Sequence, residues 1–155
     1  MKTNRPHIFL IKIMFFALLI SGIPLPNTFQ LVSPFWVLLF YIYWTIYFPA
    51  HGVFFLALIF GILLDILQGS LLGQNALALI ISTAFIVNVK QSFYVSNIST
   101  QQVYMFIAGS IYLVLFLLTH ILIQGLDFSW TILLAPLTTA LFWPAIKFIL
   151  SKLKH

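Results

Sequence analysis

Between Lys12 and Lys90 the sequence contains one formally charged side chain, that of Asp65. Over the whole chain 6% of the residues are charged and 63% are hydrophobic, whereas soluble globular domains carry about 25% charged residues. Seven basic and two acidic side chains are too few to cover a surface that faces water. The sequence therefore predicts a protein whose main solvent is lipid.

The apolar segments have the lengths and composition of membrane helices. Runs such as MFFALLI and IYLVLFLL do not alternate with polar residues, as the strands of a membrane β-barrel would. One crossing needs roughly 20 helical residues, so the chain has room for about six. Proline, glycine and polar clusters divide the expected helices into residues 8–23, 34–48, 52–67, 71–89, 102–123 and 130–150. The sequence predicts an all-α bundle in a single polytopic domain, 1–155, with the polar residues 90–101 as an internal loop.

The basic residues predict the orientation of this bundle. When six helices alternate across a membrane, all seven cations fall on one side: Lys2, Arg5, Lys12, Lys90, Lys147, Lys152 and Lys154. Basic loops are retained in the cytoplasm, so both termini are predicted to be cytoplasmic and Asp65 to lie toward the outer leaflet. This distribution indicates topology and contact with lipid headgroups, not a nucleic-acid surface.

Asp65 lies on a narrow stripe of small and polar residues. Ala57, Gly61, Asp65 and Gly69 recur every four residues, which places them on one helix face with Gln68 beside them. Asp at the centre of a membrane helix costs about 2.5 to 3.5 kcal/mol, and such residues normally face the bundle interior and have a partner. We therefore expect the carboxylate of Asp65 to point inward.

Two interpretations of this corner are compatible with the sequence. Gly69 and Gly73 have the spacing that lets helix backbones approach closely in lipid, so Asp65 and the glycines could form a contact surface for a partner helix or a ligand. Alternatively, Asp65 could brace the corner itself, with Gln74 and Asn75 donating hydrogen bonds to its carboxylate.

Other side chains indicate neither catalysis nor metal binding. The chain has no cysteine, lacks the sequence patterns of serine hydrolases, zinc proteases and phosphate-binding loops, and has one intramembrane carboxylate. His51 and His120 have no partners at metal-ligand spacing, so no cofactor or metal is expected. Most tryptophan and tyrosine side chains fall near expected helix ends and predict an interfacial belt: Trp36, Trp44, Trp130, Trp143, Tyr41, Tyr43, Tyr47, Tyr94 and Tyr104.

Two segments resemble a known family. PFWVLLFYIYW at 34–44, followed by Pro49, and GILLDILQGSLLGQNAL at 61–77 resemble the bacterial rod shape-determining protein MreD family, as do Gln91, Phe93 and FWP at 142–144. The matching positions include Pro34, Trp36, Trp44, Pro49, Leu72, Ala76, Trp143 and Pro144.

The resemblance implies a non-catalytic inner-membrane component of the cell-elongation (rod) complex. Such a protein is expected to bind MreC and thereby connect MreB filaments with the elongation transpeptidase, its polymerase partner and peptidoglycan synthesis. It also implies a fold similar to the S components of energy-coupling-factor transporters, which leaves a small-molecule-binding transporter subunit as the alternative function. The residues expected at the partner surface are Gly61, Asp65, Gln68, Gly69 and Gly73.

Overall fold

The computed structural model describes residues 6–21, 35–47, 52–68, 73–124 and 133–153. Several positions singled out in the sequence lie outside the described residues, as does the side chain of Gln68: Lys2, Arg5, Pro34, Pro49, His51, Gly69, Leu72, Trp130 and Lys154.

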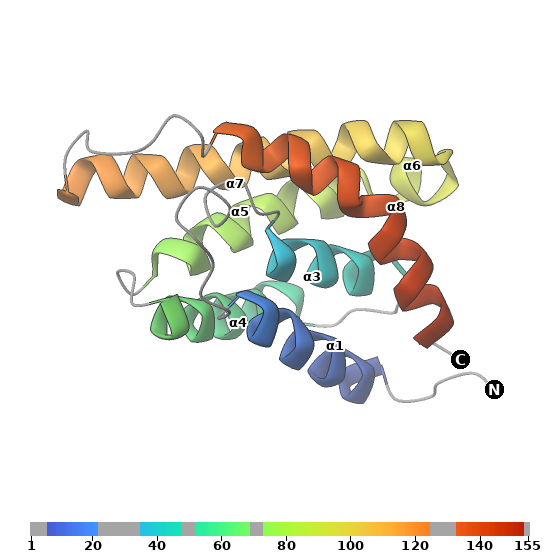
Figure 1. Cartoon of the computed structure of the whole chain (residues 1–155), viewed down its shortest axis with the longest axis horizontal. Helices are drawn as coiled ribbons and strands as arrows, with labels where there is room; N and C mark the ends of the chain where they lie inside the picture. The colour runs from blue at the N-terminus through green and yellow to red at the C-terminus, as the bar shows by residue number, and fades with distance from the viewer. Residues whose placement is uncertain (1–5, 22–34, 48–51, 69–72, 125–132, 154–155) are drawn as a thin grey trace.

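The described residues form seven helices and no strand (Figure 1). These are α1 (Pro6–Ser21), α3 (Trp36–Tyr47), α4 (Val53–Gln68), α5 (Gln74–Asn88), α6 (Lys90–Val95), α7 (Ile98–Gln124) and α8 (Ala135–Leu153). The predicted all-α class is confirmed for this part of the chain. The six longer helices coincide with the six expected segments, within a few residues at each described end.

The predicted loop at 90–101 is wrong. Residues 90–95 form α6, and α7 begins at Ile98 rather than near Gln102. Asn97 is the N-cap of α7, and its side-chain oxygen accepts a hydrogen bond from the backbone N–H of Thr100 at 3.1 Å. The polar residues that suggested a loop therefore belong to a helix start, where asparagine, serine and threonine are favoured.

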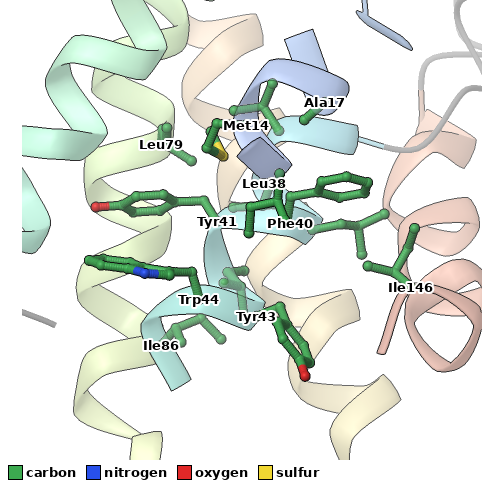
Figure 2. Packing of buried hydrophobic residues seen from close by; sticks show 14 of the residues in the cluster. Met14, Ala17, Leu38, Phe40, Tyr41, Tyr43, Trp44, Leu79, Ile86 and Ile146 are labelled. Atoms are coloured by element: carbon green, nitrogen blue, oxygen red, sulfur yellow. The ribbon is translucent and has the colours of Figure 1, made fainter. Parts of the chain in front are cut away.

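The centre of the bundle is α3. Its residues from Val37 to Ile46 are all buried, so the helix has no lipid-facing side among them. Figure 2 shows Tyr41 and Trp44 pointing together toward Leu79 and Ile86 of α5, while Phe40 points the other way. Apolar residues on every side of a helix are typical of one buried inside a protein.

The aromatic side chains of this core correct a second prediction. Trp44, Trp143, Tyr41 and Tyr43 were expected in an interfacial belt, but each is at most 2% exposed. They fill the space between helices, where large rings give more packing contact than smaller side chains. Tyr94 on α6, at 59% exposed, keeps the position expected of a belt residue.

The surface of the bundle is apolar. Along α7, for example, Val103, Val114 and Leu122 are 57%, 61% and 76% exposed. The segment Ile98–Ile123 is the one helix among the described residues long and apolar enough to cross a membrane, with 26 residues. The shorter apolar helices, such as Trp36–Tyr47, do not reach that length, so six crossings stay a prediction.

The packing of the helices gives the bundle two distinct ends. The main contacts are α4 with α5, α7 with α8, α5 with α7, and α1 with α3. In Figure 1, α4 ends and α5 begins at one end of the bundle, whereas α6, the start of α1 and the C-terminal part of α8 lie at the other.

Candidate functional site

Asp65 lies in the last turn of α4, and the start of α5 encloses its carboxylate. The side chain is fully buried. Oδ2 accepts a hydrogen bond from the backbone N–H of Gly73 at 2.8 Å. Oδ1 accepts one from the backbone N–H of Asn75 at 2.9 Å and one from the Asn75 side-chain amide at 2.7 Å. The inward orientation that the sequence predicts is therefore confirmed.

These bonds explain why a carboxylate is tolerated at this position. The first backbone N–H groups of a helix have no partner within the helix and carry partial positive charge. Gly73, the N-cap residue of α5, provides no side-chain cap, and its φ of 94° is a conformation that glycine adopts without strain. Asp65 supplies the missing cap from a neighbouring helix, with a negative charge that suits the dipole of α5.

The network continues from Asn75 into α7. The hydroxyl of Tyr112 donates a hydrogen bond to Oδ1 of Asn75. One of the two interpretations of the sequence had Gln74 donating to Asp65, but the side-chain amide of Gln74 donates to the backbone oxygen of Phe116 at 3.0 Å. Sequence reasoning missed Tyr112, because it lies in a continuous apolar run with no spacing that distinguishes its hydroxyl.

The small-residue stripe on α4 faces α5. Ala57 and Gly61 are buried, and a methyl group added at Gly61 would clash with Cα of Ala76 and lie 2.7 Å from its backbone nitrogen. Glycine is required there because the two backbones touch. A methyl group added at Gly73, in contrast, would have no heavy atom within 4 Å. Of the stripe and corner residues described, Gly73 is thus the one with open space beside it.

A second buried polar cluster, which the sequence did not indicate, lies where α6, α7 and α8 meet. Gln101 is fully buried, and its amide donates to the backbone oxygens of Phe93 at 3.0 Å and Ser96 at 3.2 Å. Its side-chain oxygen accepts hydrogen bonds from the indole N–H of Trp143 at 3.0 Å and from Nζ of Lys147 at 3.0 Å. One glutamine therefore joins three helices.

Aromatic rings surround this cluster. Trp143 packs edge-on against Phe93, with ring centroids 5.3 Å apart, and lies 6.3 Å from Tyr43 of α3. Nζ of Lys147 lies 5.8 Å from the ring centroid of Tyr47, within cation–π range. One sequence signal was available: once Asn97 is taken as the cap, Gln101 is the fourth residue of a helix and not the end of a loop.

Gln102, the neighbouring residue, compensates for the proline inside α8. Pro144 has no N–H, so the backbone oxygen of Ala140, four residues earlier, lacks its usual helical partner. The side-chain amide of Gln102 donates to that oxygen at 3.2 Å. Figure 1 shows α8 bending between its two halves, as helices do at proline.

Hydrogen bonding and close packing are the chemistry that these clusters provide. Within the described ranges no three side chains of His, Cys, Asp or Glu come together to hold a metal. Both clusters connect helices distant in sequence through buried polar groups, which fixes how the helices pack.

Comparison with known proteins agrees with the resemblance seen in the motifs. The family model described as rod shape-determining protein MreD matches residues 1–153. A rod shape-determining protein MreD of Haemophilus influenzae is 26% identical over 141 residues, which cover 90% of this chain and 86% of the relative. No solved structure matches, so the expected likeness to transporter S components stays a prediction. The chain belongs to the MreD family of rod shape-determining membrane proteins.

Proposed function

We propose that the chain is a multi-pass, non-catalytic component of the bacterial inner membrane that binds MreC. Through MreC it would connect MreB filaments with the transpeptidase and polymerase that extend the peptidoglycan. Membership of a structural, shape-determining family supports the role in rod shape and the absence of catalysis. The helix α6, which begins at Lys90, and the C-terminal part of α8, which carries Lys147 and Lys152, lie at the same end of the bundle, and this supports a cytoplasmic location for that end.

The observation that best supports the partner site is the braced but open corner at Gly73. Asp65 holds the start of α5 against α4 through three hydrogen bonds, while one side of Gly73 remains free of neighbouring atoms. Apolar side chains flank the corner, with Ile66 at 62% and Leu77 at 46% exposed. We define Ile66, Gly73 and Leu77 as the corner surface, and a transmembrane helix of MreC is its proposed occupant.

In this proposal Asp65 acts through the shape of the corner. Its carboxylate is fully buried, so a partner helix would meet the glycine and the apolar side chains. Small residues allow the close backbone approach on which helix association in lipid depends. Gly61, also expected at the partner surface, instead serves the contact between α4 and α5.

Co-purification with MreC from detergent-solubilised membranes tests the proposal. Gly73→Asn adds bulk to the open side with a residue that tolerates positive φ, and Ile66→Trp adds bulk beside it. Both are expected to lower the yield of MreC at least several-fold without loss of the chain from the membrane. Leu141→Trp, at a 62% exposed site on α8, is the matched control and should leave the yield unchanged. Wild-type yields with both corner variants would show that MreC binds elsewhere.

A further inference from the structure

The ammonium group of Lys147 has no anionic partner among the described residues. The chain contains two acidic side chains, Asp65 and Asp127, and the first is held at the opposite end of the bundle, where α4 meets α5. Lys147 is nevertheless partly buried. A partly buried cation is stabilised by a counter-ion, and none of the residues that the structure describes supplies one.

The surroundings of Lys147 fix the ammonium in place. The Gln101 oxygen accepts one of its three protons at 3.0 Å, and the Tyr47 ring lies on another side. Gln101 is itself immobilised by bonds to Trp143 and to the backbone of Phe93. Within the described ranges Gln101 is the one hydrogen-bond acceptor for this ammonium, so its other protons can bind an anion from outside the chain.

We infer that Lys147, positioned by Gln101 and Tyr47, binds the phosphate of an anionic phospholipid headgroup at this end of the bundle. The exposed side chains nearby favour a lipid over an acidic protein segment. Tyr94 on α6 is 59% exposed, and Phe148 and Ile149 on α8 are 60% and 50% exposed, so apolar surface for acyl chains adjoins the cation. Tyrosine is typical of the level at which headgroups lie.

Lys152 provides an internal comparison. It lies on the same helix, and its Nζ rests over the ring of Phe148 at 4.6 Å, but it is exposed. Any surface lysine attracts anionic lipid through charge alone. If Lys147 forms a specific site, replacing it should reduce binding of anionic lipid more than replacing Lys152. If charge alone attracts the lipid, the two replacements should have the same effect.

Native mass spectrometry of the full chain in a neutral detergent tests this inference. The protein is exposed to equal amounts of phosphatidylglycerol and phosphatidylcholine with the same acyl chains, and the retained lipids are counted. Wild type is expected to prefer phosphatidylglycerol about fivefold or more. Lys147→Gln and Lys147→Met should reduce the preference to near one, Lys147→Arg should keep it, and Lys152→Gln should leave it nearly unchanged.

Several results would overturn the inference. One is an unchanged preference for phosphatidylglycerol in Lys147→Gln or Lys147→Met, judged in a variant whose melting temperature is close to that of the wild type. Another is an equal loss of that preference in Lys147→Gln and Lys152→Gln. The melting temperature of the protein is also measured with each added ligand. If inorganic phosphate raises it as much as the lipid does, and the increase is lost in the neutral Lys147 variants, the site binds free phosphate. A poly-glutamate peptide that raises the melting temperature in this way while the lipid has no effect would assign the site to an acidic protein segment. MreC is absent from these measurements, so they are independent of the proposed function.

Discussion

At the scale of single residues, buried polar side chains in this protein act as partners for backbone groups of other helices. Asp65 caps α5, Gln101 binds the end of α6, and Gln102 replaces the donor that Pro144 lacks. In lipid an unpaired backbone group costs several kcal/mol, because no water is present to satisfy it. These side chains therefore determine which helix ends can meet.

Replacing Asp65 tests the capping role. Asp65→Ala leaves the backbone N–H groups of Gly73 and Asn75 without their acceptor, so we expect a loss of about 2 kcal/mol in the free energy of unfolding. Asp65→Asn keeps one oxygen and should lose about half as much. Titration with SDS in mixed micelles measures both values. Leu63→Ala, at a 41% exposed site on the same helix, is the control, and equal losses from Leu63→Ala and Asp65→Ala would contradict the cap.

At the scale of elements, α4 and α5 approach until their backbones touch. The contact is at Gly61, where an added methyl group would lie 2.7 Å from the nitrogen and 2.8 Å from Cβ of Ala76. The α7–α8 contact at Gly109 is looser, since a methyl group there would lie 3.2 Å from Cα of Pro136. The two glycines therefore differ in how much a side chain would disturb their helix pairs.

Alanine at the two glycines should separate these cases. Gly61→Ala must push α5 away from α4, which we expect to cost about 1–3 kcal/mol. Gly109→Ala should be nearly neutral, because a displacement of a few tenths of an ångström is offset by the higher helix propensity of alanine, up to about 1 kcal/mol. Melting temperatures in detergent compare them directly. A Gly109→Ala variant as unstable as Gly61→Ala would show that both contacts are equally close.

The pairing of Gln102 with the proline-containing turn of α8 can be tested by a double-mutant cycle. Gln102→Leu leaves the Ala140 oxygen unpaired and is expected to cost about 1–2 kcal/mol of unfolding free energy. In a Pro144→Ala background the restored N–H of residue 144 satisfies that oxygen, so the same substitution should cost about 1 kcal/mol less. The wild type, the two single variants and the double variant are compared by SDS titration. An identical cost in both backgrounds would mean that Gln102 does not substitute for the missing donor.

Whole-molecule properties divide into those that sequence reasoning could predict and those that it could not. Helix segments and the inward Asp65 follow from composition, breakers and the cost of charge in lipid. The burial of Trp44 and Tyr41 does not, because α3 is apolar on every side and no face of it is distinguished. Gln101 was missed for the opposite reason: its polar neighbours indicated a loop, and only the packing of α8 shows that it points inward.

The orientation of the bundle is the last property to test. The segment Ile98–Ile123 rises about 39 Å at 1.5 Å per residue, enough to carry α6 and Leu122 to opposite sides of a core about 30 Å thick. Because the chain has no cysteine, Ser92→Cys on α6 and Leu122→Cys on α7 can each carry a single, uniquely reactive thiol. An impermeant maleimide added to spheroplasts should label residue 122 at once and residue 92 only after permeabilisation. Labelling of both from the same side would contradict the crossing by α7, and the reverse pattern would place the termini outside.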